Sequence, residues 1–373
     1  MDNKPNIKLI FSENTWIEGE AIRQLQKTSE LEGIQYSVGL PDLHPGRGNP
    51  VGAAFISKGI IYPYIVGNDV GCGVALFSTE IKTNKIKKDK WLKKLKNFEE
   101  PYDGDLEFWR TEFGLNPSSF DISLGTIGGG NHFAELQTIE KIMDQKSFDD
   151  LKLDKNYVML LIHSGSRSIG EALLRRHTEK YGAKGLLDDS EDAIKYLETH
   201  EHALKWAKCN RALISYRFAS ELGSESNLII DVCHNSITKT SDDGNNLLWL
   251  HRKGAAASDS GYVVIPGSRG TLSYLVKAKG DQKANAWSLP HGAGRKWNRG
   301  SCKERLSDRF NAKSLIQTEI GSYVICEDKD LLYEEAPYAY KNIDSVIGEL
   351  LKADLIEVIA TLKPVITYKV RKS

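Results

Sequence analysis

Short apolar runs broken by glycine, proline and asparagine characterise the first part of the chain. Such runs are typical of β-strands joined by turns, and they predict strands over residues 34–38, 51–57, 60–66 and 74–79. Ahead of them, Thr15 and Glu18 have the spacing of a helix-capping box, and Ile17, Ala21 and Leu25 follow at helical spacing. We therefore expect a helix that begins at Thr15.

Helical periodicity returns twice, predicting a long helix from about residue 191 to 222 and a shorter one near 343–351. A lysine-rich stretch, residues 82–96, predicts a surface helix in which Trp91 and Leu95 supply an apolar side. We interpret its charges as a solvated face in preference to an RNA-binding patch. Further strands are expected at residues 157–162, 228–232, 247–250, 262–265, 272–276, 323–326 and 365–370.

The order of these elements bears on the fold class. Helices do not alternate strictly with strands, which argues against a doubly wound α/β fold. The pattern fits an α+β fold with a β-rich centre surrounded by helices. Since no linker rich in proline, glycine or serine divides the chain, we expect one domain over residues 1–373.

Composition limits the possible function classes. With 40% hydrophobic and 27% charged residues, the 373-residue chain is typical of a globular protein, and fifty basic and fifty acidic residues cancel. Any nucleic-acid binding must therefore depend on local patches. Five irregularly spaced cysteines do not resemble a disulfide framework, the N-terminus lacks a secretory signal, and the apolar runs are too short to span a bilayer. We expect a cytoplasmic protein that does not bind membranes.

Histidines supply the first candidate chemistry. Three of the nine lie in helix-like polar sequence and are interpreted as surface residues: His177, His200 and His202. The other six lie at strand ends or turns beside glycine or small polar residues: His44, His132, His163, His234, His251 and His291. A single histidine of this kind is more often structural than functional, but six in one local context favour a site on loops held by strands.

A carboxylate and a thiol, Asp69 and Cys72, follow an apolar run within the glycine-rich residues 67–73. With several of the histidines they could form one or two metal sites, and a bridging thiolate would hold two cations together for phosphoryl chemistry. Thiolate and imidazole ligands favour zinc over manganese, although the spacing is not that of a zinc finger, so the metal stays open. The structural alternative for Cys72 is a small buried core residue.

Four glycine-rich loops combine exposed backbone with arginine or small polar donors, as expected for phosphate binding: residues 128–131, 164–167, 266–270 and 291–295. No P-loop motif is present, which argues against an ordinary P-loop NTPase.

Taken together, these segments resemble the RtcB family of RNA ligases. The resemblance depends on motifs in one order from about residue 39 to 369: 41–46 (PDLHPG), 66–73 (VGNDVGCG), 124–133 (LGTIGGGNHF), 163–167 (HSGSR), 234–235 (HN), 251–255 (HRKGA) and 291–295 (HGAGR). It implies a single-domain α+β fold with a β-rich centre, GTP as cofactor and two manganese ions.

Position by position, the resemblance implies that one metal is held by Asp69, Cys72 and His132, and the other by Cys72, His163 and His234. It makes His291 the catalytic residue that accepts GMP. The residues matched to nucleotide binding are Asn131 as a triphosphate contact, Glu135 and Lys369 as guanine contacts, and His132, Phe133, Ala134, His234, Asn235, Pro266, Gly267, Ser268, Arg269, Ser273, His291, Gly292, Ala293 and Gly294.

The implied reaction transfers GMP from His291 to an RNA 3′-phosphate, and a 5′-hydroxyl then attacks the activated end and displaces GMP. Family members also open 2′,3′-cyclic phosphates. For holding the RNA by charge, the candidates are Arg167 and the lysine-rich face of residues 82–96. We expect a monomer engaged in RNA repair, with an archease-like activator as a further partner. The alternatives are a metal-dependent cyclic phosphoesterase and a non-catalytic RNA-end sensor.

Two departures from the family pattern bear on substrate preference. The family commonly continues its His-Gly-Ala-Gly-Arg motif with a Met-Ser-Arg-like run, where this chain has Lys296, Trp297, Asn298 and Arg299. Its Pro-Gly-Ser loop usually continues with methionine, where this chain has Arg269.

Overall fold

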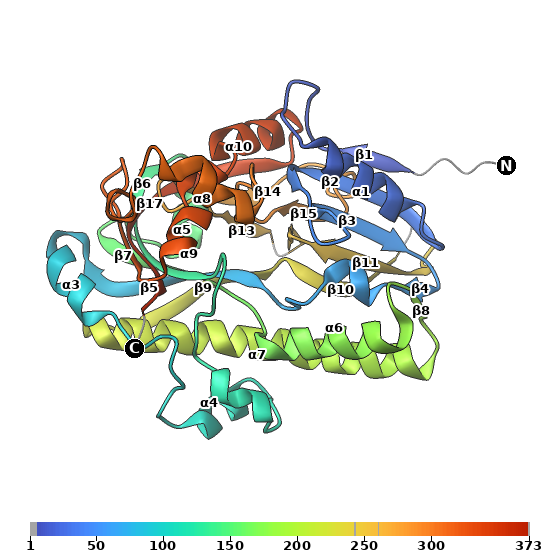
Figure 1. Cartoon of the computed structure of the whole chain (residues 1–373), viewed down its shortest axis with the longest axis horizontal. Helices are drawn as coiled ribbons and strands as arrows, with labels where there is room; N and C mark the ends of the chain where they lie inside the picture. The colour runs from blue at the N-terminus through green and yellow to red at the C-terminus, as the bar shows by residue number, and fades with distance from the viewer. Residues whose placement is uncertain (1–5, 242–243, 260, 372–373) are drawn as a thin grey trace.

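A computed structural model describes residues 6–241, 244–259 and 261–371. Two sheets lie at the centre, and helices cover them on the outside (Figure 1). Runs of strands and helices follow one another without strict alternation, which confirms the expected α+β class. Within the described residues, no helix combines the length and the apolar character needed to cross a membrane.

The larger sheet carries most of the site described below. Its order is β13 (Tyr262–Ile265), β14 (Ser273–Ala278), β17 (Ile356–Val370), β6 (Phe133–Ile142), β7 (Tyr157–Ser164), β5 (Gly73–Lys82) and β9 (Ser226–Cys233), with β16 (Tyr323–Cys326) paired to β17. The first and last strands, β13 and β9, contact each other, so the sheet curls nearly closed. Side chains of β7 from Val158 to Ser164 are all buried, as expected for a strand covered on both faces.

The smaller sheet has the order β1 (Ile7–Leu9), β2 (Ile34–His44), β3 (Val51–Ser57), β11 (Leu247–Lys253) and β10 (Asn235–Ser241). Two short pairs complete the β-structure: β12 (Ala255–Ala257) with β15 (Ser288–Pro290), and β4 (Ile60–Ile61) with β8 (Leu186–Leu187).

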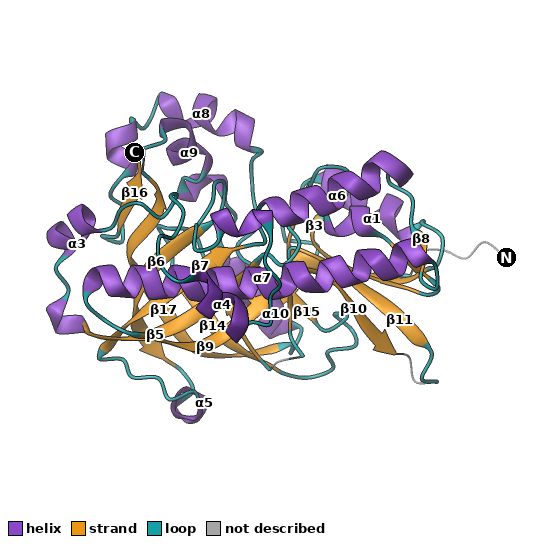
Figure 2. Cartoon of the chain, turned by 90° about the horizontal axis from the view of Figure 1, so that it is seen from below, coloured by secondary structure: helices purple, strands orange, loops and turns teal. Residues whose placement is uncertain are grey.

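One long helix, α7 (Glu191–Leu222), runs along both sheets, and α6 (Ser168–Tyr181) packs beside it (Figures 1 and 2). The Ser190 hydroxyl caps its first turn and Gly223, in the left-handed conformation, ends it. The other helices are α1 (Gly19–Ser29), α2 (Pro63–Val66), α3 (Lys88–Lys94), α4 (Leu106–Glu112), α5 (Gln145–Asp150), α8 (Arg299–Ser307), α9 (Lys329–Glu334), α10 (Ile343–Lys352), and the 3₁₀ turns η1 (Thr83–Lys85), η2 (Ser119–Ser123), η3 (Ala312–Leu315) and η4 (Pro337–Ala339).

Three local predictions were wrong. The first helix begins at Gly19, because Ser12 and Thr15 bond the Glu349 carboxylate of α10 instead of capping a helix. The run at 60–66 is not one strand: Pro63 starts the short helix α2 after β4. Residues 82–96 form the end of β5, η1 and α3 in place of one helix, and Trp91 and Leu95 are both buried.

The interpretation of the helical histidines as surface residues was wrong for two of the three. His177 is buried and donates from Nε2 to the Lys184 carbonyl at 3.0 Å. His200 is buried and accepts at Nε2 from the Ile237 backbone N–H at 3.0 Å, and His202 is half-buried. Helical polar sequence did not reveal these contacts, because their partners lie on other elements.

Candidate active site

Four of the metal-ligand candidates lie at the same edge of the larger sheet. In the register of this sheet, Gly73 of β5 pairs with Ser164 of β7 and Cys233 of β9, and Phe133 of β6 pairs with His163 of β7. Neighbouring strands are about 4.8 Å apart. The residues next to these pairs therefore form a row across β6, β7, β5 and β9, which with Asp69 we call the donor row: Asp69, Cys72, His132, His163 and His234.

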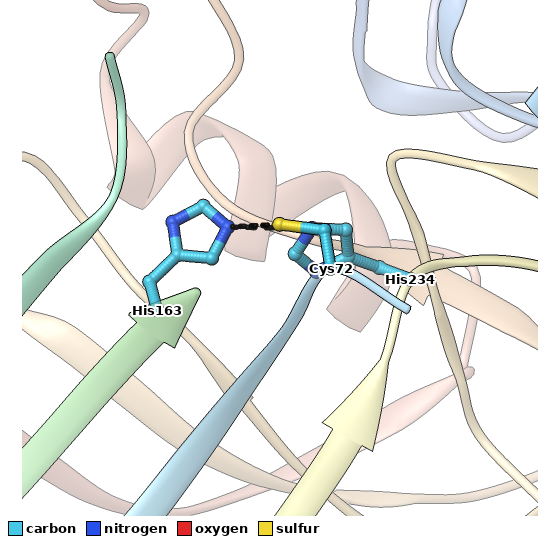
Figure 3. A group of neighbouring side chains, drawn as sticks. All are labelled: Cys72, His163 and His234. Atoms are coloured by element: carbon cyan, nitrogen blue, oxygen red, sulfur yellow. Dashed lines mark hydrogen bonds between the residues drawn. The ribbon is translucent and has the colours of Figure 1, made fainter. Parts of the chain in front are cut away.

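Distances show how closely the donor row converges. The Cys72 Sγ lies 3.2 Å from His163 Nε2, and His163 Nε2 lies 3.3 Å from His234 Nε2 (Figure 3). The same Sγ lies 3.4 Å from His132 Nε2. On the other side, His132 Nε2 lies 2.9 Å from Asp69 Oδ2. Two groups of potential ligands result, Asp69–Cys72–His132 and Cys72–His163–His234, each with its donor atoms within 4.8 Å of one another.

Electrostatics in the donor row suit cation binding. Burial lowers the pKa of His163 and His234 well below the usual imidazole value, so both rings are neutral. Burial and the Asp69 charge raise the pKa of Cys72. Burial also acts to raise the pKa of Asp69, but His132, Cys72 and Lys253 together lower it. The imidazole nitrogens and the thiol lie 3.2–3.4 Å apart, and they carry too few protons for every contact to be a hydrogen bond. A divalent cation would bind these atoms together, and the thiol would then lose its proton. Cys72 is the donor common to both groups.

Helix α7 supports the loops that carry the donor row. The buried Arg211 guanidinium donates to the Gly71 and Ser164 carbonyls at 2.8 Å each and pairs with Asp231 of β9. The preceding residue, Asn210, bonds the backbone of Gly125, Thr126 and Gly165. One turn of α7 therefore fixes the loops at residues 69–72, 125–126 and 164–165 in relation to each other.

His291 faces the donor row from the other side. Its ring centroid is 4.9 Å from that of His234, and its Nδ1 donates to Asp42 Oδ2 at 2.7 Å. A carboxylate only accepts, so a neutral His291 carries its proton on Nδ1 and its lone pair on Nε2. Gly254 has a positive φ and lies against the ring, where a Cβ would come within 3.0 Å of it.

His44 lies next to His291, with ring centroids 6.2 Å apart and planes inclined by 19°. Its Nδ1 donates to the Asp42 carbonyl at 2.9 Å, and burial lowers its pKa to about 3. His44 is one of the six histidines that the sequence singles out, and Asp42 lies in the same 41–46 motif, but no contact of either residue with His291 was predicted. A signal was available, since residues two apart in a strand point to the same face and both lie near the end of β2.

A cavity of about 640 Å³ joins these groups. Most of the residues predicted to bind nucleotide lie in its wall: Asn131, Phe133, Glu135, His234, Asn235, Pro266, Gly267, Ser268, Arg269, His291, Gly292, Ala293, Gly294 and Lys369. Three do not. His132 lies in the donor row, Ala134 points to the opposite face of β6 into the core, and the Ser273 hydroxyl accepts hydrogen bonds from Gln137 and the Gly267 N–H behind the loop.

Buried charges gather at the Lys369 end of this cavity. Glu335 pairs with Arg299 at 2.8 Å, Arg295 at 3.2 Å and Lys369 at 3.4 Å, and these cations outweigh burial and lower its pKa to about 2. Glu135 lies nearby between Gln137 and Thr367, and burial raises its pKa to about 7. Sequence reasoning missed Glu335, because its partners lie 34 to 40 residues away and no local motif marks it.

Three candidate cationic contacts lie at different distances from this centre. Arg167, at the start of α6, lies against Gly128, and its Nε is buried without a hydrogen-bond partner among the described residues. Arg269 uses one nitrogen to bond the Leu315 and Leu332 carbonyls, and its other two are buried and bond no residue that the structure describes. The lysine-rich face begins where β5 ends, ten residues from Cys72, and at about 3.3 Å per residue this is about 30 Å away.

Comparison with known proteins gives consistent matches. A family model described as tRNA-splicing ligase RtcB matches residues 24–101 and 117–370, and residues 102–116, which contain α4, lie outside that match. RNA-splicing ligase RtcB2 of Escherichia coli is 46% identical over 365 residues, covering 96% of this chain and 94% of that protein. tRNA-splicing ligase RtcB of Archaeoglobus fulgidus is 29% identical (93% and 90% covered), and RNA-splicing ligase RtcB of Escherichia coli K12 is 27% identical (98% and 100% covered).

Proposed function

Because the chain belongs to the RtcB family, we propose that it is an RNA ligase that joins 3′-phosphate or 2′,3′-cyclic phosphate ends to 5′-hydroxyl ends in RNA repair. GTP supplies the energy through a GMP adduct of His291. The observation that carries this mechanism is the position of His291, whose Nδ1 is bonded to Asp42 while its ring faces the donor row inside the cavity.

The donor row is proposed to hold two manganese ions, one at Asp69, Cys72 and His132 and the other at Cys72, His163 and His234. The donor chemistry fits a shared pair of cations, since the one thiol lies between two imidazoles and the carboxylate lies at the end of the row. Nitrogen and sulfur donors also suit zinc, so the metal dependence needs its own measurement. When bound, the ions neutralise charge on phosphate oxygens.

Asp42 and His291 perform the first step. The Nε2 lone pair of His291 attacks the α-phosphorus of GTP, an N–P bond forms, the bond to the bridging oxygen breaks and pyrophosphate leaves. As positive charge develops on the imidazole, the Asp42 carboxylate stabilises it and keeps the ring in place. The hydrogen bond between Asp42 and His291 also makes the imidazole a good leaving group in the next step.

In the second step an oxygen of the RNA 3′-phosphate attacks the GMP phosphorus and the N–P bond breaks. The 5′-hydroxyl of the other RNA end then attacks the RNA phosphorus, loses its proton and displaces GMP.

Guanine recognition is assigned to Glu135 and Lys369, and triphosphate binding to Asn131, which all line the cavity. The buried Glu135 carboxylate is surrounded by hydrogen-bond donors and is suited to accept from the guanine N–H groups.

The test is incubation with GTP labelled at the α-phosphate and manganese, followed by denaturing electrophoresis. We expect an acid-labile, alkali-stable label on the protein and none on His291→Ala, with ligation reduced by at least about 1,000-fold. His202→Ala, on α7, is the matched control and should label normally. An unlabelled parent protein that still binds RNA ends would instead indicate an end sensor.

A further inference from the structure

The loop that follows His291 continues into a segment rich in cations, residues 295–310, which we call the basic arm. Its six basic residues outnumber its two acidic ones: Arg295, Lys296, Arg299, Lys303, Arg305 and Arg309 against Glu304 and Asp308. The arm begins in the cavity, where Arg295, Trp297, Asn298 and Arg299 line the wall together with His291 and Cys72. Asn298 caps α8, so the chain turns outward directly after Trp297.

Trp297 is the aromatic residue of the arm nearest to His291. One side of its indole packs against an apolar cluster that includes Leu306 and Leu315, and the ring stays partly exposed. The Lys296 Nζ lies 5.7 Å from the ring centroid and the Arg305 guanidinium 5.3 Å from it. Both cations lie over this partly exposed ring, and because both side chains are themselves exposed, a base that stacks on the ring can displace them from it.

The charges beside this ring are uncompensated, unlike those deeper in the cavity. Arg295 pairs with Glu335, and Arg299 pairs with both Glu334 and Glu335. By contrast, Lys296 and Arg305 are exposed and form no ion pair with any residue that the structure describes. Aromatic rings interleaved with free cations are the arrangement by which proteins bind single-stranded nucleic acid, by stacking of bases and attraction of phosphates.

Building on the ligase function proposed above, we propose that Trp297 is a stacking platform for the terminal base of the 3′-phosphorylated RNA, and that Lys296 and Arg305 bind the phosphates beside that base. The 3′-phosphate must reach the GMP on His291, and Trp297 lies on the same loop, six residues further along the chain. The base at the 3′ end is therefore the one that this ring can reach. Because every base has a π-face, the platform accepts RNA ends of any sequence.

The experiment uses a 3′-phosphorylated oligoribonucleotide with 2-aminopurine as its terminal base, whose fluorescence is quenched by stacking. With the full-length protein we expect quenching on binding. Trp297→Met keeps an apolar side chain against the cluster but removes the ring, so it should fold, lose the quenching and bind the oligonucleotide roughly 5- to 150-fold more weakly. Trp297→Phe keeps a ring and should retain most of the quenching.

Controls separate this inference from the proposed function. Phe108→Ala removes a 55% exposed aromatic ring on α4, outside the cavity, and should change neither quenching nor affinity. Lys296→Gln combined with Arg305→Gln should weaken binding at low salt and flatten its salt dependence. These measurements need no GTP, so they stand even if the protein is never guanylylated.

Undiminished quenching in Trp297→Met would overturn the inference. So would a rise in KM for the 5′-hydroxyl fragment with none for the 3′-phosphate fragment. Loss of GMP labelling by Trp297→Met in a folded protein would also overturn it, because the ring would then serve the nucleotide site.

Discussion

The donor row and His291 face each other across one cavity, yet they are held in place in different ways. Each imidazole of the row, and Cys72, lies within one residue of a strand of the larger sheet, so backbone register sets their spacing. His291 follows the three-residue strand β15 and depends on side-chain and close backbone contacts, chiefly the Asp42 carboxylate and Gly254. The spacing of Cys72 and the three histidines is therefore set by the sheet, whereas the orientation of His291 depends on a few contacts with side chains and backbone, of which the one hydrogen bond is to Asp42.

This difference makes metal binding and nucleophile orientation separable by substitution. The largest effect is expected for Cys72→Ala, because Cys72 contributes to both ligand groups. Manganese affinity should fall by about 100-fold or more and GMP labelling with it. Titration calorimetry measures the manganese affinity, and circular dichroism should show that the β-strands remain intact. Two undisturbed manganese sites in this variant would contradict the assignment of the bridging donor.

A smaller effect, confined to the other side of the cavity, is expected for Asp42→Asn. The amide can hold the ring of His291 but favours the wrong tautomer and does not stabilise its positive charge. GMP labelling should slow by roughly 100- to 10,000-fold, while manganese binding stays as in the parent protein. Equal losses of both would show that the two sides are not independent.

The smallest effect is expected on the stability of the protein, for a substitution at the Lys369 end of the cavity. Burial raises the pKa of Glu135 to about 7. A carboxyl whose pKa is higher in the folded than in the unfolded chain contributes stability below the unfolded value and loses it as pH rises through about 7. Glu135→Gln stays neutral, so without nucleotide it should exceed the parent in stability by about 1–3 kcal/mol at about pH 8.5 and match it near about pH 4.

Urea unfolding at the two pH values checks this prediction. A Glu135→Gln variant that is less stable than the parent at the higher pH would mean that Lys369 and Arg269 keep the Glu135 carboxylate ionised and favourably paired.

Parts of the molecule were predictable from sequence because their signals are local. The long helical periodicity of α7 and the apolar run of β7 gave both elements nearly to the residue. β6 was missed, because Glu135, Gln137 and Glu140 interrupt its apolar residues, and Glu135 and Gln137 are buried against partners from other strands. Long-range partners of this kind leave no pattern in a window of neighbouring residues.

The same holds for the site. Glycines beside His132, His163 and His291 pointed to the loops that carry chemistry. The structure places His163 and His291 in the wall of one cavity and His132 directly behind His163, with ring centroids 5.3 Å apart. Nothing in the sequence related Asp42 to His291, which are 249 residues apart. The charge cluster around Glu335 is equally non-local. The roles of Asp42 and Glu335 therefore follow from contacts between distant parts of the chain and could not be recognised from residue type.

The contacts of Asn210 and Arg211 have a consequence for how the molecule is assembled. The loops at 69–72, 125–126 and 164–165 leave the ribosome long before α7 does, and until α7 docks they lack the side chains that bond their backbone. His234 and His291 are synthesised later still. Asp69, Cys72 and His132 are therefore all synthesised before the helix that fixes their loops, and the two ligand groups reach their final geometry only after His234 has been made and α7 has docked.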